Sequence, residues 1–185
     1  MLIEAGDRVL PSFPASLSRN AHDALTALGV EVRTGAAVTA CTASDITVGG
    51  ERITVGTILW AAGVMASPAA NWMQVAHDRV GRVVVEPDLT LPDHPEIFVI
   101  GDTASVLGPD GKRLPGLAPV AKQQGQYVAR SIRARLSGAT IAPFRYRHLG
   151  SLATIGRGCA VADFGWIRLS GRLAWLLWGL GPCFT

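Results

Sequence analysis

Gly101, Asp102 and the segment Gly116–Gly125 are the residues of this 185-residue chain whose types and spacing best suggest chemistry. The apolar run Ile97–Ile100 precedes the Gly-Asp pair and predicts a buried strand that delivers a carboxylate to its carboxyl end. A predicted helix over 119–136 follows, and its first turn would offer unpaired N–H groups to an anion. Because Asp102 can accept hydrogen bonds from sugar-type hydroxyls, these features predict a ligand site at the edge of an open α/β sheet.

Two other segments accompany this pair, which alone would be weak evidence because turns commonly use both residues. The sequence WAAGV occupies Trp60–Val64, and the helix start reads APVAKQQ over Ala118–Gln124. In this order, the three segments resemble the C-terminal half of flavin-dependent pyridine-nucleotide oxidoreductases. The likeness is greatest to the type II NADH dehydrogenases, which are single-subunit NADH:quinone oxidoreductases, and it runs from about Leu2 to about Leu180.

The resemblance implies an α/β fold that forms part of a flavoprotein with two dinucleotide-binding domains. Residues 1–66 would be the C-terminal part of an incomplete, Rossmann-like NADH domain, 67–142 the C-terminal part of the FAD domain, and 143–185 the start of a truncated membrane-associating region. Gly156–Val161 is the nearest string to a dinucleotide fingerprint, but the required acid does not follow it, so it predicts a turn between two strands. We expect the isolated chain to bind FAD poorly and to oxidise little NADH.

Glu4 ends a short apolar strand at the start of the chain. In a dinucleotide fold an acid at the end of the second strand binds the adenosine ribose of NADH, and the resemblance gives Glu4 that position. Its carboxylate would repel a 2′-phosphate, which favours NADH over NADPH, although Arg8 nearby weakens the preference. The alternative is a solvated carboxylate at a strand end.

Small residues occupy two other segments that we expect to contact the bound cofactors. By resemblance, Ala62 and Gly63 pass close to the flavin and nicotinamide rings, which a larger side chain would separate; the alternative is tight packing of a helix on a strand. The helix start at Ala118 would lie beside the pyrimidine edge of the flavin, where N–H groups and the helix dipole stabilise negative charge.

Lys122 could stabilise the reduced flavin or a bound quinone, or it could be a solvated lysine. Pro119 stands where the resembled family usually has a Gln, which puts that quinone contact in doubt, whereas Gln123 is retained. The predicted cofactor-binding residues are Glu4, Ala62, Gly63, Gly101, Asp102, Ala118, Lys122 and Gln123.

Composition narrows the class of protein. With 49% hydrophobic residues and a net charge of +3, the chain is not expected to be disordered. It has no basic cluster interleaved with aromatic residues, so nucleic acid is not an expected partner. Cys41, Cys159 and Cys183 are far apart, which favours free buried thiols over disulfides or a metal site. No side chain is predicted to be a proton-transfer catalyst, because the cofactors carry the chemistry.

The elements that must position these residues follow from periodicity and turn residues. Apolar residues at helical spacing predict a helix over 14–28, which Gly29 ends. Gly49 and Gly50 predict a tight hairpin turn. The predicted strands are 30–32, 46–48, 52–55, 57–60 (buried on both faces), 82–86 and the strand at 97–100.

The tail Trp166–Leu180 combines tryptophan and leucine with arginine. After Gly171 its apolar run is shorter than the roughly 20 residues that span a bilayer, so it predicts a helix lying in the membrane interface. A core-packing hairpin and helix is the alternative. Pro182 would break the helix where the resembled enzymes continue, which suggests truncation or a shifted reading frame.

Taken together, the residues and the resemblance predict a fragment of an FAD-dependent NADH:quinone oxidoreductase. In the complete enzyme hydride would pass from NADH to FAD, and electrons then to quinone. It would lie peripherally on the cytoplasmic face of the inner membrane, and a homodimer is compatible with this prediction. Two alternatives stay open: a related flavoprotein reductase of the sulfide:quinone or ferredoxin type, and a non-catalytic truncated remnant with a membrane-binding tail.

Overall fold

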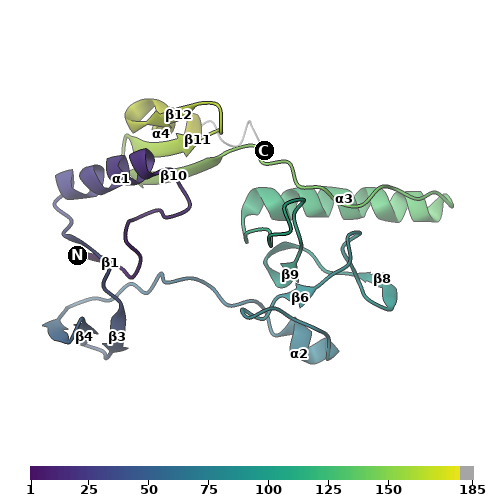
Figure 1. Ribbon diagram of the computed structural model, residues 1–185, viewed down its shortest axis with the longest axis horizontal. Coiled ribbons are helices and arrows are strands. Elements are labelled where there is room, and N and C mark those ends of the chain that lie inside the picture. Colours follow the sequence, from purple (N-terminus) through teal and green to yellow (C-terminus); the bar gives the residue numbers. More distant parts are fainter. Residues whose placement is uncertain (180–185) are drawn as a thin grey trace. The chain divides into compact units, whose positions relative to one another are not determined.

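The computed structural model describes residues 1–179 and divides the chain into two compact units (Figure 1). The first unit contains Met1–Ala61 together with the chain from Leu149 onward, and the second contains Ala62–His148. Each unit has its own buried apolar residues, so each is described by itself.

The first unit opens with a β-α-β element. Strand β1 (Leu2–Glu4) pairs in parallel with β2 (Val32–Thr34), and helix α1 (Ala15–Ala27) makes the crossover that parallel strands require. Gly29 follows α1 with a φ of 81°, the left-handed conformation that commonly ends a helix. The predicted helix is confirmed, whereas the strand predicted at 30–32 lies two residues further along the chain.

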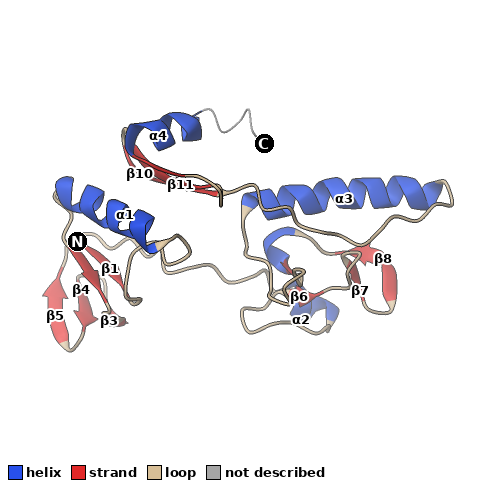
Figure 2. Ribbon diagram, turned by 45° about the horizontal axis from the view of Figure 1, so that its top comes forward, coloured by secondary structure: helices blue, strands red, loops and turns tan. Residues whose placement is uncertain are grey.

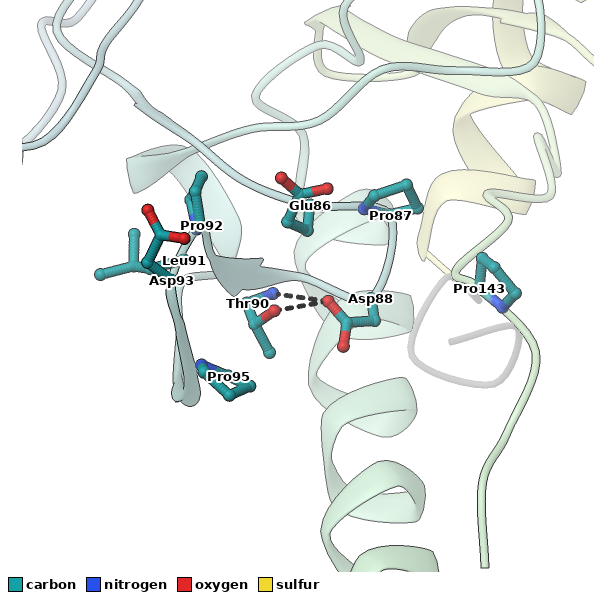
Figure 3. A pocket seen from close by; sticks show the side chains of 9 residues that line it. All are labelled: Glu86, Pro87, Asp88, Thr90, Leu91, Pro92, Asp93, Pro95 and Pro143. Atoms are coloured by element: carbon teal, nitrogen blue, oxygen red, sulfur yellow. Dashed lines mark hydrogen bonds between the residues drawn. The ribbon is translucent and has the colours of Figure 1, made fainter.

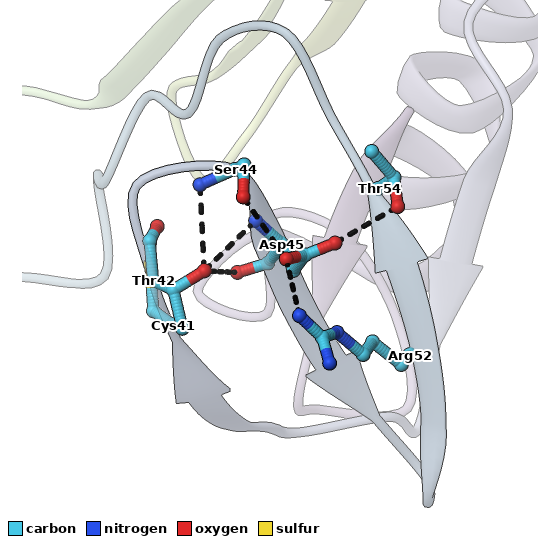
Figure 4. A network of polar contacts seen from close by, with 6 residues as sticks. All are labelled: Cys41, Thr42, Ser44, Asp45, Arg52 and Thr54. Carbon is cyan, nitrogen blue, oxygen red and sulfur yellow. Dashed lines mark hydrogen bonds and ion pairs between the residues drawn. The ribbon is translucent and has the colours of Figure 1, made fainter.

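An antiparallel meander follows, formed by β3 (Val38–Cys41), β4 (Asp45–Val48) and β5 (Glu51–Thr54). Gly49 and Gly50 both have positive φ, as the tight hairpin turn between β4 and β5 requires, so this predicted hairpin is confirmed. Figure 4 shows Asp45 at the start of β4, where it accepts hydrogen bonds from Ser44, Arg52 and Thr54.

The later part of the chain adds a second meander to the same unit. It consists of β10 (Ser151–Gly156), β11 (Cys159–Asp163) and β12 (Arg168–Ser170), and helix α4 (Gly171–Gly179) follows directly. The turn predicted around Gly156–Val161 is confirmed, because β10 and β11 pair antiparallel across it.

Small side chains hold α4 against this sheet. Ala174 of α4 and Ala160 and Ala162 of β11 are all fully buried and form one cluster. A second cluster joins β11 to the start of the chain, because Leu17 of α1 and Phe13 in the segment before it pack with Val161. The alanines leave space for the helix backbone to approach the sheet closely.

The second unit contains a long helix, α3 (Ala118–Leu136), and the four short strands β6 to β9; Figure 2 shows α3 beside β6, β7 and β8. Its core cluster joins α2, the strand pairs and α3 through residues such as Ala70, Val83, Leu91 and Tyr127. Strands β6 and β9 pair in parallel, and β7 and β8 pair antiparallel. The elements are α2 (Ala69–Met73), β6 (Val83–Val84), β7 (Thr90–Leu91), β8 (His94–Phe98), the 3₁₀ turn η1 (Gly101–Thr103), β9 (Ala104–Ser105) and α3 (Ala118–Leu136).

Helix α3 confirms the prediction for 119–136, but three predicted strands differ. The apolar segment 57–60 forms no strand, and its Leu59 and Trp60 are 89% and 64% exposed, because no strand of the described chain pairs with it. Strand β8 ends at Phe98, before the Gly-Asp pair, so the carboxylate is delivered by a turn instead of a strand end. The strand expected at 82–86 is limited to the two residues of β6.

The cysteines and the tail also bear on the predictions. Cys41 is exposed and Cys159 half-buried, so the expectation that both thiols are buried is wrong; Cys183 lies outside the described residues. Among the described helices, none is long and apolar enough to cross a membrane. Pro182 also lies outside the described residues.

Candidate functional site

The Gly101–Thr103 turn is fixed to helix α3 by a buried glutamine. Gly101 has a φ of 68°, a left-handed conformation that costs a residue with a Cβ about 1–2 kcal/mol. Its N–H donates a hydrogen bond of 2.6 Å to Oε1 of Gln124, whose side chain is 99% buried on α3. The left-handed conformation of Gly101 and its hydrogen bond to Gln124 therefore fix the position of the turn relative to α3.

Asp102 lies on this turn with its carboxylate against Gly116, just before α3. A Cβ built on Gly116 would lie 3.1 Å from Oδ1 and 3.4 Å from Cγ of Asp102, tighter than ordinary contact. A side chain at position 116 would therefore push the carboxylate aside. Asp102 is exposed, so its oxygens face solvent and not a core. The predicted convergence of Asp102 with the start of the helix is present in the structure.

The start of α3 leaves one backbone donor open, the N–H of Ala118. Among the described residues no side chain caps the helix, Pro119 has no N–H, and the N–H groups of Val120 and Ala121 donate to the carbonyl oxygen of Leu117. Ala118 and Lys122 are exposed, and they are one helical turn apart, on the same face. The first turn can therefore offer one N–H group, the positive end of the dipole and one ammonium group to an anion.

Gln123 is hydrogen-bonded to the backbone of Arg147. Its Nε2 donates to the carbonyl oxygen of Arg147 and its Oε1 accepts from the N–H of Arg147, both at 2.9 Å. This pair of hydrogen bonds ties the extended segment after α3 back to the first turns of the helix. The amide of Gln123 is thus engaged by the backbone.

The remaining predicted residues lie on other segments of the chain. Glu4 belongs to the first unit, where its Oε1 accepts a hydrogen bond of 2.7 Å from the N–H of Gly6. Ala62 and Gly63 start the second unit on an exposed segment without regular structure, and Gly63 has a φ of 105°. A Cβ on Gly63 would meet no described atom within 4 Å.

Two functional candidates were missed by the sequence interpretation. Gln124 gave no signal because it reads as one more polar residue of a helix start, although it is buried and holds Gly101. Asp78 and Arg82 form an ion pair of 2.8 Å whose side chains are only 7% and 17% exposed. The sequence signal for a polar turn was the spacing of four residues between Asp78 and Arg82, with Gly81 directly before Arg82.

Asp78 is strongly stabilised as a carboxylate. Burial alone would raise its pKa, but hydrogen bonds from Arg82, the Val80 amide and Ser105 outweigh burial and lower the pKa of Asp78 to about 2. The carboxyl group is therefore charged over the whole physiological range.

A separate shallow cavity of about 520 Å³ lies elsewhere in this unit. Carboxylates and prolines line it, and Figure 3 shows Asp88 accepting hydrogen bonds from the N–H and hydroxyl of Thr90. Asp88 also pairs with Arg135 at 3.0 Å, so this carboxylate is already occupied. In the described part of the chain, no three His, Cys, Asp or Glu side chains are grouped so that they could hold a metal ion.

Residues 1–125 match the family model described as pyridine nucleotide-disulphide oxidoreductase. The chain belongs to this family. The match covers β1 through the first turns of α3 and so includes Glu4 and the Asp102 turn. The resemblance noted from the sequence motifs is thereby confirmed.

Curated relatives of this pyridine nucleotide-disulphide oxidoreductase include type II NADH:quinone oxidoreductases. The chain is 43% identical to Ndh of Mycobacterium tuberculosis over 190 residues, which is 96% of this chain and 40% of the relative. It is 34% identical to the enzyme of Staphylococcus haemolyticus, over 83% of this chain and 39% of that relative. The chain thus spans about two fifths of the length of these relatives.

Solved structures confirm the α/β fold of the family. NDH2 of Plasmodium falciparum in complex with NADH has a TM-score of 0.83 at 17% identity, covering 95% of this chain and 52% of that one. The reduced CoADR-RHD of Bacillus anthracis has a TM-score of 0.72 at 22% identity, covering 87% of this chain and 29% of that one.

Proposed function

We propose that this chain supplies part of the FAD and NADH sites of a membrane-associated NADH:quinone oxidoreductase. The observation that carries the proposal is the Asp102 turn, which Gln124 docks on α3 and Gly116 leaves open. An exposed carboxylate beside an uncapped helix start suits a ligand that carries both hydroxyls and negative charge. The 43% identical relative, a type II NADH:quinone oxidoreductase, supports the choice of FAD, NADH and quinone.

The residues of the site fit a flavin nucleotide. Asp102 would accept hydrogen bonds from hydroxyls of its sugar-like chain, and the glycine at 116 leaves the room that a Cβ would fill. The N–H of Ala118 and the positive end of α3 would face the part of the ligand that gains negative charge, where the helix dipole contributes roughly 0.3–2 kcal/mol. When bound, FAD supplies the capacity to accept hydride from NADH and to pass two electrons to a quinone.

Other residues of this chain would orient ligand and substrate. Ala118 carries only a methyl group, so the helix start can be approached closely, and the ammonium group of Lys122 would attract an anionic ligand or a quinone oxygen. Gln123 would act through its place in the first turns of α3, since its amide holds Arg147. Ala62 and Gly63 would admit two rings in face-to-face contact because neither has a bulky side chain.

Glu4 is the proposed contact to NADH. The amide of Gly6 fixes its carboxylate, and the parallel β1–β2 pair places it at a strand end, where an acid binds ribose hydroxyls in dinucleotide folds. A carboxylate there favours NADH over NADPH.

Peripheral membrane association is part of the proposal. Helix α4 buries Ala174 but leaves Leu173, Leu176 and Trp178 at least half exposed, and Trp166 before it is 87% exposed. The helix packs on its sheet and still presents apolar side chains. Exposed tryptophan and leucine suit the interface of a bilayer on the cytoplasmic face of the inner membrane. A homodimer remains compatible with this arrangement.

A chimera tests the function directly. Residues 2–179 of this chain would replace the aligned segment of the Mycobacterium tuberculosis relative, whose remaining sequence supplies the rest of the enzyme. We expect the purified chimera to hold FAD and to reduce a soluble quinone analogue with NADH, and Asp102→Ala to lower its FAD content. A folded chimera that binds NADH but no FAD would refute the proposal.

The isolated 185-residue chain is the matched comparison. We expect it to show little flavin absorbance and little NADH-dependent quinone reduction, because it lacks the glycine-rich pyrophosphate loops. Substantial activity of the isolated chain would contradict that expectation.

A further inference from the structure

Asp78 is the centre of a polar network in the second unit that lies away from the exposed carboxylate of Asp102. Its Oδ1 accepts hydrogen bonds from the N–H groups of Val80 and Arg82, both at 3.0 Å. Its Oδ2 accepts from Nε of Arg82 at 2.8 Å. These contacts close a local turn and leave the Arg82 guanidinium oriented by the carboxylate.

The same ion pair also reaches two distant backbone segments. Ser105 donates its hydroxyl to Oδ2 of Asp78 at 3.1 Å, and Arg82 donates through Nη1 to the carbonyl oxygen of Leu114 at 2.9 Å. Arg113 donates to the hydroxyl of Ser105 as well. One segment lies three residues after Asp102, and the other lies two residues before Gly116.

The chain between these two segments folds back on itself. The N–H of Leu114 donates to the carbonyl oxygen of Val106 at 2.8 Å, and that of Gly108 donates to Lys112 at 2.7 Å. The Asp78–Arg82 pair therefore holds both branches of a hairpin whose outer ends carry Asp102 and Gly116. Asp102 and Gly116 are close to each other, because a Cβ built on Gly116 would lie 3.1 Å from Oδ1 of Asp102.

We propose that Asp78 is a positioning residue for the Asp102 site. By joining Ser105 to the Arg82–Leu114 contact, it sets the separation of the two branches and so the orientation of the Asp102 carboxylate toward a hydroxyl-bearing ligand. The inference rests on the proposed function, because the ligand is the flavin nucleotide. Asp78 acts through the backbone and is not a catalytic residue.

A double-mutant cycle in the chimera tests this inference. FAD affinity is measured by equilibrium titration for the parent, Asp78→Asn, Asp102→Asn and the double variant. We expect Asp78→Asn to weaken FAD binding roughly tenfold in the parent, within the range of coupled contacting groups. In the Asp102→Asn background the same change should cost less than twofold, because the carboxylate that it orients is already gone.

Asp45→Asn is the matched control. It removes a carboxylate with the same kinds of partners from the other unit, so FAD affinity should stay within twofold of the parent. Equal losses for Asp78→Asn in both backgrounds, or no loss in either, would overturn the inference. If Asp78→Asn does not fold, Ser105→Ala keeps the Asp78 carboxylate, removes its hydrogen bond from the Ser105 hydroxyl together with the contact of that hydroxyl to Arg113, and completes the same cycle.

The two proposals fail in distinguishable ways. A parent chimera that folds but holds no FAD refutes the proposed function, and amide hydrogen exchange of the 185-residue chain then decides the positioning role. Asp78→Asn should speed exchange in residues 101–116 at least fivefold more than Asp45→Asn does. Unchanged exchange in that segment would overturn the positioning role independently of flavin.

Discussion

Asp45 and Asp78 are the centres of two hydrogen-bond networks that are built from the same kinds of polar groups but serve different purposes in this chain. Each carboxylate accepts hydrogen bonds from an arginine and a serine, and each has its pKa lowered to about 2. Hydrogen bonds from Arg52, Thr54 and Ser44 lower the pKa of Asp45, and burial opposes this effect.

The two networks differ in the parts of the chain that they join. The partners of Asp45 are at most nine residues away and lie in one hairpin (Figure 4), where Asp45 is buried but the Arg52 side chain is 73% exposed. The contacts of the Asp78–Arg82 pair span 27 and 32 residues, and Arg82 is 17% exposed. A local network stabilises a turn that its own sequence already favours, whereas a long-range network decides where a functional turn lies.

The largest difference should appear when the arginines are replaced. Arg82→Gln leaves the buried carboxylate of Asp78 without its ion pair and the Leu114 carbonyl without its donor, so we expect the second unit to lose about 2 kcal/mol of stability. Arg52→Gln is the matched change in the first unit and should have a clearly smaller effect, because exposed pairs contribute little. Native-state hydrogen exchange measures the two units separately. Equal effects in both units would remove the distinction between the networks.

A second prediction concerns the other long-range contact of the site. Gln124→Leu leaves the N–H of Gly101 without its acceptor, and we expect a loss of about 1–2 kcal/mol together with weaker FAD binding in the chimera. Gln126→Leu makes the same substitution at an exposed position of α3 and should leave both quantities nearly unchanged. Chemical unfolding and FAD titration measure the pair. A control as damaging as Gln124→Leu would show that leucine disturbs the helix in general.

The elements that could be predicted from the sequence are those whose signal is local. Helix α3 shows an apolar stripe at helical spacing, and Gly49 with Gly50 marks a tight turn whatever surrounds it. The Gly-Asp pair and the helix start were also predicted to converge, because in open α/β sheets the carboxyl end of a strand and the start of the following helix face the same crevice. The sequence therefore predicted that the two segments lie near each other, although Asp102 lies on a 3₁₀ turn and not at the predicted strand end.

The contacts that escaped prediction depend on distant partners. The burial of Gln124 follows from the position of Gly101, and the role of Asp78 follows from Ser105, neither of which a local pattern shows. The segment 57–60 fails for the same reason, since apolar composition predicts burial only where another element covers the segment.

A third, smaller effect should come from Gly116→Ala, which changes the orientation of the Asp102 carboxylate but not the stability of the fold. Gly116→Ala would bring a Cβ to 3.1 Å from Oδ1 of Asp102, so the carboxylate must move, and we expect FAD binding of the chimera to weaken about threefold to tenfold, within the range of coupled contacts. Gly56→Ala is the control, because no described atom lies within 4 Å of its Cβ and its φ is not positive. Stability should change little in either variant. Unaltered FAD affinity in Gly116→Ala would show that the carboxylate orientation does not matter.

The smallest effect should be a pH dependence shared by the two networks. Both carboxyl groups have a folded-state pKa of about 2, below the 3.8 usual for an aspartate side chain, so each contributes stability that is fully present above about pH 4 and lost as the pH falls toward 2. Asp78→Asn should therefore flatten the acid dependence of stability in the second unit, and Asp45→Asn should flatten it in the first. Hydrogen exchange between pH 2 and 5 follows both units in one experiment. If Asp45→Asn also flattened the second unit, the two networks would be coupled, and the contrast between a local and a long-range carboxylate would have to be abandoned.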